Sequence, residues 1–212
     1  MKTRFESREA LIAEHGTDGT LVDSDLSFLD LSGLDLAGLD LAGSTLSGAI
    51  LHGTDLSRCN LSNIYVQESD FTGVNFEGAK LQLAFFQRVK MSGANFKDTH
   101  LTHARLYLSD ISGSDFSGSD IAEGDLQGSD FSRCIFANVK LINVIMRDAL
   151  VTDAKFESCD MRGVDLRKVN LHDATYTDIQ SEGAIFYGKS PWDSQLSDEK
   201  NLKEKLVTFD GE

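Results

Sequence analysis

Residues 31–51 read LSGLDLAGLDLAGSTLSGAIL, in which an apolar residue, most often leucine, returns at every fifth position. The same register extends in both directions, from Leu21 to Phe186. Of its 34 positions, 33 are apolar or aromatic, and the exception is Ser181. Small or modestly apolar residues such as Ala49 and Cys59 form a second column two residues earlier. We expect both columns to point inward.

This spacing excludes the ordinary regular structures. Five residues advance an α-helix by about 500°, which would scatter the apolar positions around the helix. A straight strand keeps one face only over even spacings, so a period of five requires the chain to turn once per repeat. Glycine, which tolerates tight turns, recurs two residues after the central apolar position, for example at Gly33, Gly73 and Gly113. The pattern predicts an all-β solenoid.

Four segments carry a more specific resemblance: ANFKD at 94–98, SDFSG at 114–118, AKFES at 154–158 and VDLRK at 164–168. They resemble the A(D/N)LXX motif of the pentapeptide-repeat family. The resemblance implies a right-handed quadrilateral parallel β-helix in which four pentapeptides make one coil and residues 20 apart stack. Residues 21–186 would then form about eight coils, in a rod about 40 Å long at roughly 4.8 Å between paired strands.

The two ends of the chain depart from the repeat, and we expect them to form short helical caps. A cap is needed at each end because an open solenoid end exposes apolar side chains and unpaired backbone. We expect residues 1–20 to form an N-terminal cap with a short helix, and 21–188 to form the β-helix. Residues 189–212 would form a polar C-terminal helix and tail, with the helix at 197–206 and Trp192 plugging the last coil.

Composition argues against several classes of partner. The net charge of −14 at pH 7 disfavours direct binding of nucleic acid, which needs concentrated Lys and Arg. No apolar run approaches the ~20 residues that span a bilayer, and the N-terminus is charged where a signal peptide is apolar. We therefore expect a cytoplasmic protein without a membrane partner.

No motif indicates catalysis, and we expect no enzyme activity, cofactor or metal. The three cysteines, Cys59, Cys134 and Cys159, all occupy the small inward column, where a reduced thiol packs as a small hydrophobic group. His100 and His103 form an HxxH sequence, but at this spacing they fall on a strand and a corner, not on one helical face. We interpret them as solvated surface histidines.

Charge is distributed in bands along the sequence. Residues 21–60 carry six acidic residues against Arg58 alone, and 109–130 carry six with no Lys or Arg. Between them, residues 61–108 carry four acidic residues against five basic ones. Many of the aspartates lie just before a central residue, where the side chain can bond to nearby backbone. The candidate acidic surface consists of Asp25, Asp30, Asp35, Asp40, Asp110, Asp115, Asp120, Asp125 and Asp130.

The middle band also departs from the repeat at outward positions. Aromatic or Arg residues replace the usual Asp or Asn at three positions 20 apart, and neighbouring corner positions lose their glycine or polar residue. Clustered aromatic and Arg side chains are typical of interaction hot spots, although an aromatic ladder that only stabilises the solenoid is an alternative. The candidate protein-binding face is Tyr65, Leu83, Phe85, Arg88, Arg105, Tyr107 and Leu108.

Two functional hypotheses follow. The first is a non-enzymatic interaction module or scaffold that presents this face to a protein partner, with the acidic zones steering the encounter. The second comes from the family resemblance, since some members mimic duplex DNA, bind DNA gyrase and protect it from toxins or quinolones. The partner's identity and the choice between monomer and homodimer stay open.

Overall fold

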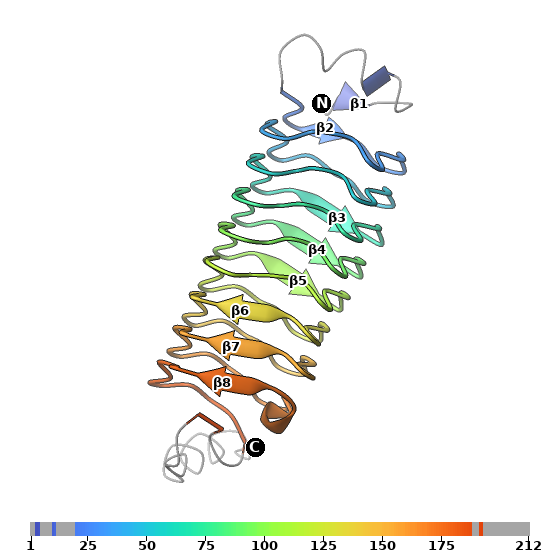
Figure 1. Cartoon of the computed structure of the whole chain (residues 1–212). Helices are drawn as coiled ribbons and strands as arrows, with labels where there is room; N and C mark the ends of the chain where they lie inside the picture. Colours follow the sequence, from blue (N-terminus) through green and yellow to red (C-terminus); the bar gives the residue numbers. More distant parts are fainter. Residues whose placement is uncertain (1–2, 5–9, 12–19, 188–190, 193–212) are drawn as a thin grey trace, which may run out of the picture.

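The computed structural model describes residues 3–4, 10–11, 20–187 and 191–192. Residues 20–187 wind into an elongated stack of coils (Figure 1). Parallel bridges join residues 20 apart, from Thr20–Asp40 to Asp165–Ile185. Four pentapeptides therefore make one coil, and the 166 residues from 20 to 185 make about eight coils. The predicted β-solenoid is confirmed.

Most contacts between neighbouring coils are isolated β-bridges, and longer strands occur on two opposite sides of the rod. The first pair is β1 (Thr3–Arg4) with β2 (Ser24–Asp25). One three-stranded sheet contains β3 (Tyr65–Gln67), β4 (Phe85–Gln87) and β5 (Arg105–Tyr107). The other contains β6 (Ile135–Ala137), β7 (Lys155–Glu157) and β8 (Thr175–Thr177), preceded by the short 3-10 helix η1 (Leu171–Asp173).

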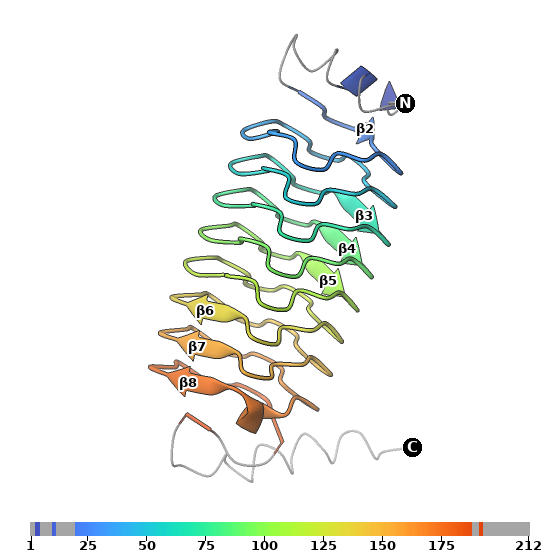
Figure 2. The same cartoon turned by 45° about the vertical axis from the view of Figure 1, so that its right-hand side comes forward.

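The two three-stranded sheets differ by ten residues in their place on the 20-residue coil, so they lie on opposite sides of its square section. Their arrows run in opposite directions across the rod in Figures 1 and 2. The side that carries β3, β4 and β5 is the one on which the candidate protein-binding face falls.

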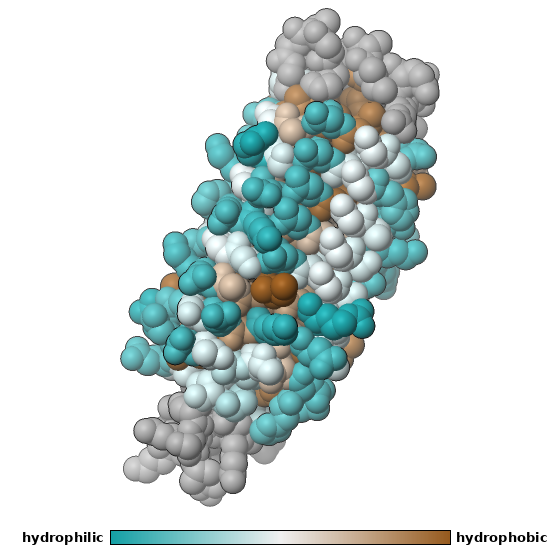
Figure 3. Space-filling view, in the orientation of Figure 1, coloured by the Kyte–Doolittle hydropathy of each residue, from teal (hydrophilic) through white to brown (hydrophobic). Residues whose placement is uncertain are grey.

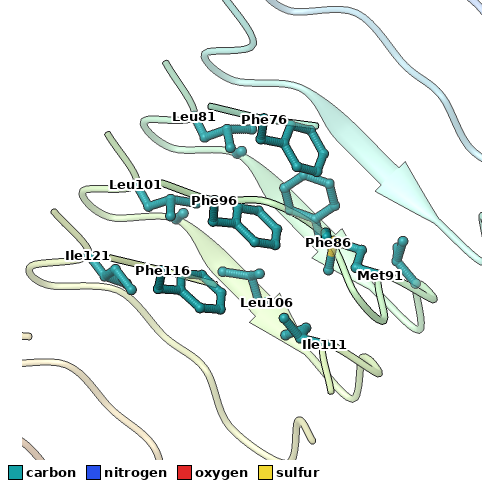
Figure 4. Close-up of a cluster of buried hydrophobic side chains, with 14 of the residues drawn as sticks. Phe76, Leu81, Phe86, Met91, Phe96, Leu101, Leu106, Ile111, Phe116 and Ile121 are labelled. Atoms are coloured by element: carbon teal, nitrogen blue, oxygen red, sulfur yellow. The ribbon is translucent and has the colours of Figure 1, made fainter. Parts of the chain in front are cut away.

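The core is a set of ladders of central apolar residues, each stacked on the residue 20 positions away. Figure 4 shows Phe76, Phe96 and Phe116 pointing into the rod from three successive coils. Their ring centroids lie 4.9 and 4.5 Å apart, and all three rings are buried. Because each coil covers the apolar surface of the next, the core is continuous along the rod.

The second inward column is less apolar than the sequence pattern suggests, because buried Ser and Thr residues share it with Ala, Val and Cys. Several of their hydroxyls donate to the carbonyl oxygen 23 residues earlier: Ser44 Oγ lies 2.6 Å from Leu21 O, and Thr54 Oγ1 lies 2.8 Å from Leu31 O. The column therefore satisfies buried backbone acceptors as well as filling space.

One described residue at each end of the chain packs against the core. Ala10 and Leu11 are helical, and Leu11 is completely buried in the hydrophobic core. Trp192 meets the rings of Tyr176 and Phe186 edge-on, and its Nε1 donates to Ser181 Oγ at 2.8 Å. Ser181, the one polar residue of the central column, thus bonds to this tryptophan. The helix expected at 197–206 lies outside the described residues.

No helix within the described parts of the chain has the length and apolar character needed to cross a bilayer.

Candidate protein-interaction face

The seven residues of the candidate face come together on one side of the rod. Central residues Val66, Phe86 and Leu106 of β3, β4 and β5 point inward and are fully buried. Side chains on either side of them must then point outward, because neighbouring residues of a strand alternate. We call the outward set Tyr65, Leu83, Phe85, Arg88, Arg105, Tyr107 and Leu108 the aromatic–arginine face.

An aromatic stack forms the middle of the aromatic–arginine face. The rings of Tyr65 and Phe85 stack with centroids 5.1 Å apart and planes 5° apart, and Tyr107 meets Phe85 edge-on at 6.0 Å. Such cross-strand pairs stabilise a sheet, as the ladder interpretation expects. Tyr65 nevertheless stays 42% exposed. The stack therefore supports the solenoid and also offers an open aromatic surface.

Two leucines flank this stack at corners of the coil. The second turn residue of each corner adopts positive φ, which glycine tolerates best, and glycine occupies most of these corners near the N-terminus. Leu83 and Leu108 adopt φ of 59° and 51° there, and each is 56% exposed. A left-handed backbone costs a residue with a β-carbon roughly 1–2 kcal/mol. More than half of each side chain stays exposed, although Leu108 also packs over Gly128 of the next coil.

Charge on the face is carried mainly by Arg105. Its side chain has no ion-pair or hydrogen-bond partner among the residues that the structure describes. Arg88 is different, since Nη1 lies 3.6 Å from Glu68 Oε1 in an exposed pair. Arg105 is therefore the group on the face best placed to pair with an incoming carboxylate.

Tyr107 contributes more to the fold than the sequence suggests. Its hydroxyl donates to Asp125 Oδ2 at 2.7 Å, linking two coils. Burial, the hydrogen bond to Asp125 and the charge of that carboxylate raise the pKa of Tyr107 to about 12. The ring therefore stays neutral, with its hydroxyl already engaged.

The candidate acidic surface is spread around the rod. Its aspartates stand just before central residues, so Asp25, Asp30, Asp35 and Asp40 occupy all four sides in turn, and the set from Asp110 to Asp130 does the same. Each accepts a hydrogen bond from the backbone N–H two residues later, as Asp110 does from Ser112 at 3.1 Å. The aspartates thus bond to nearby backbone, as expected. They form two rings around the rod, which we call the acidic collars, instead of one acidic stripe along it.

Several of these carboxylates are also engaged by a side chain of a neighbouring coil. Lys97 Nζ lies 3.1 Å from Asp115 Oδ2, and Lys140 Nζ lies 3.2 Å from Asp120 Oδ2. Burial opposes ionisation of Asp115, but its hydrogen bonds with Ser117 and Lys97 outweigh this and lower its pKa. Part of the acidic charge is therefore compensated within the rod.

The remaining candidates for chemistry are occupied or buried. Burial raises the pKa of Cys59 to about 11 and of Cys134 to about 12, which keeps both as unreactive thiols. The thiols do more than pack, because Cys134 Sγ donates to Ile111 O at 3.2 Å. His103 Nδ1 lies 3.4 Å from Glu123 Oε2. Within the described residues, no three His, Cys, Asp or Glu side chains group as metal ligands.

The sequence matches two repeat models over most of the solenoid. The model described as a pentapeptide repeat region matches residues 39–116, and the model of eight pentapeptide repeats matches residues 109–148 and 145–175. The chain belongs to the pentapeptide-repeat family. The 20-residue coil seen here is thus the coil of a pentapeptide-repeat protein, in agreement with the resemblance noted above.

Solved pentapeptide-repeat structures resemble the chain at low identity. QnrB1, a plasmid-mediated fluoroquinolone resistance protein, is 18% identical with a TM-score of 0.49, covering 87% of this chain and 98% of its own. HetL, involved in heterocyst differentiation regulation in the cyanobacterium Nostoc sp. strain PCC 7120, is also 18% identical with a TM-score of 0.37, covering 91% and 100%. No curated protein sequence matches the chain.

Sequence reasoning missed one residue of this pentapeptide-repeat surface. Phe28 occupies a corner position with φ of 63° and is 80% exposed. Its ring lies over Gly48 of the next coil, where a β-carbon would collide with it. The criterion that selects Leu83 and Leu108, a bulky apolar residue in a glycine corner, would also have selected Phe28.

Proposed function

We propose that this pentapeptide-repeat protein is a non-enzymatic scaffold that binds a protein partner through the aromatic–arginine face. The observation that carries the proposal is the pair of exposed leucines, Leu83 and Leu108, in left-handed corners beside an aromatic stack. The coil imposes positive φ at its corners, so the unusual feature is a large apolar side chain placed there and left exposed, which is a reason to look for function. Exposed apolar side chains around aromatic and Arg residues are what a protein interface buries.

The surroundings support a protein as the partner. The face of the rod seen in Figure 3 is largely hydrophilic, with apolar residues in separate small patches. Strands β3, β4 and β5 form one sheet, from which large side chains of three successive coils can contact a facing surface together. Arg105 would pair with a carboxylate of the partner, while the acidic collars repel partners of the wrong charge.

The test is recovery of partners by the tagged full-length protein from cells that express it naturally. Phe85→Ala combined with Arg105→Glu removes the centre of the stack and reverses the free charge. We expect this variant to lose at least nine-tenths of a specific partner, about 1.4 kcal/mol or more of binding free energy. Unchanged recovery with an intact fold would refute the face.

Ile135→Asn provides a matched control. Ile135 is 42% exposed, like Tyr65, but it lies in β6 on the opposite side of the rod. Its replacement removes a similar exposed apolar surface without touching the aromatic–arginine face. Partner recovery by this variant should equal that of the unmodified protein.

Binding of DNA gyrase or another topoisomerase through the acidic surface is a second candidate, supported by the net charge of −14 and the two acidic collars. The basic and aromatic band between the collars and the pairing of Asp115 and Asp120 with lysines count against it. Inhibition or protection of gyrase supercoiling by micromolar purified protein would favour this candidate over the aromatic–arginine face.

A further inference from the structure

One edge of the rod joins the aromatic–arginine face to the next side and carries more exposed apolar surface. Phe28 and Leu108 occupy the same corner, four coils apart, which is roughly 19 Å at 4.8 Å per coil. Both adopt positive φ, at 63° and 51°. Ile50, 41% exposed, lies between them on the same edge.

A shallow depression of about 260 Å³ lies along this edge between Phe28 and Leu108. Phe28 borders it because its ring lies on Gly48, and Arg88 connects it to the aromatic–arginine face. We call this depression the corner groove; its lining includes Gly48, Ile50, Glu68, Ser69, Arg88 and Lys90.

The charged side chains of the corner groove differ in whether they have an ion-pair or hydrogen-bond partner. Glu68 pairs with Arg88 at 3.6 Å. Asp70, which also lines the groove, accepts the hydroxyl of Thr72 at 2.7 Å and lies 3.3 Å from Nε2 of His52. Within the described chain, the Lys90 ammonium makes no hydrogen bond or ion pair. Its charge helps to lower the pKa of Asp70, the residue it faces in the preceding coil, but the two groups form no ion pair. Among the charged side chains that line the groove, Lys90 is therefore the one without a direct partner, and a carboxylate complements it.

We propose that the corner groove binds an extended, acidic segment of a protein partner, with a carboxylate at Lys90 and apolar side chains against Phe28, Ile50 and Leu108. The distance from Phe28 to Leu108 corresponds to about six residues of extended chain at roughly 3.3 Å each. This proposal rests on the proposed function, because it extends the same binding surface around the edge. In the proposed complex, the exposed Phe28 ring is covered by the bound segment.

The probe is a phage-displayed library of random twelve-residue peptides, selected on the immobilised full-length protein. Enriched peptides are synthesised with a fluorophore and titrated by fluorescence polarisation. We expect them to combine Asp or Glu with aliphatic or aromatic residues. Phe28→Gly and Lys90→Glu should each raise the Kd at least tenfold, whereas Ile135→Asn should leave it unchanged. Glycine suits the φ of 63° at position 28, so that variant should fold.

The outcomes separate this proposal from the proposed function. Peptides whose Kd responds to Phe85→Ala and Arg105→Glu, but not to Phe28→Gly or Lys90→Glu, would overturn the corner groove and leave the face intact. Peptides with the reverse response would support the groove alone. Failure to enrich any peptide, or enrichment of basic peptides, would overturn the groove as a site for an acidic segment.

Discussion

At the scale of single residues, the inward small column shows how a side chain can serve two purposes. Cys134 fills space beside the core and donates to Ile111 O, which also accepts the N–H of Ser114 at 3.3 Å. Ser114 makes the equivalent bond to Met91 O at 3.1 Å. The hydroxyl of Ser114 and the thiol of Cys134 are thus equivalent, because each donates one hydrogen bond to the coil before it.

This equivalence predicts the effect of two substitutions. Cys134→Ser keeps a donor to Ile111 O and should change the free energy of unfolding by less than about 1 kcal/mol, whereas Cys134→Val removes the donor and should cost about 1 kcal/mol or more. Urea denaturation of the two variants measures the difference. Equal destabilisation by both would show that the thiol only fills space.

The residue types found at corners with positive φ are a second feature at this scale. Many non-glycine residues with positive φ are Asp or Asn, such as Asp23 and Asn63, which tolerate the left-handed region. Among the described residues with positive φ, the large apolar ones are Phe28, Leu83 and Leu108, and all three are exposed. Under the proposed function, these apolar corners contact the partner.

At the scale of elements, the outward ladders link neighbouring coils through side chains 18 residues apart. On the side that carries β3, β4 and β5, Tyr107 bonds to Asp125, and further along Arg147 Nε lies 2.6 Å from Asp165 Oδ2. Arg167 adds two more hydrogen bonds to Asp165, from Nε to Oδ1 at 2.9 Å and from Nη2 to Oδ2 at 2.7 Å. Asp165 is 6% exposed, so this outward position is buried by the arginines that neutralise it.

The Asp165 cluster predicts how stability depends on pH. Burial alone raises the pKa of Asp165, but the hydrogen bonds from Arg167 and Arg147 outweigh it and hold that pKa below its ordinary value. Since the pKa is depressed in the folded state, the stabilisation is present above the unfolded pKa of about 3.9 and is lost as pH falls through the folded pKa.

Asp165→Asn should therefore cost about 1–3 kcal/mol at pH 7, because two arginines lose a buried charged acceptor. The cost should shrink as the pH falls below about 4. Urea denaturation of both proteins across this range measures it. A difference between the two proteins that stays constant with pH would contradict the assigned role of Asp165.

At the scale of the whole molecule, the five-residue register predicted the solenoid because every inward residue contacts the residues above and below it. The number of sides came from the family resemblance, since a period of five is compatible with more than one coil size. Contacts 18 residues apart, such as Tyr107 with Asp125, could not be predicted before the coil size was known. The seven residues of the aromatic–arginine face could be selected in advance because each breaks the repeat on the outside.

The acidic residues show the limit of such selection. Counting charges along the chain predicted two acidic zones, but the coil distributes each zone over four sides, as with Asp25, Asp30, Asp35 and Asp40. Pairing with lysines from neighbouring coils then compensates part of the charge, as at Asp115 and Asp120. An acidic zone of the sequence thus winds around the rod as a collar. Which side of the rod presents its charge to a partner depends on the three-dimensional coil.

If the proposed function is right, Leu83 and Leu108 serve binding at the expense of the fold. The most direct test is the double variant Leu83→Gly with Leu108→Gly, in which stability and affinity for a recovered partner are measured together. Glycine relieves the left-handed corners, so we predict a gain of up to about 1 kcal/mol per site in the free energy of unfolding. Binding should weaken at least tenfold. Unchanged affinity, or a loss of stability, would contradict the account.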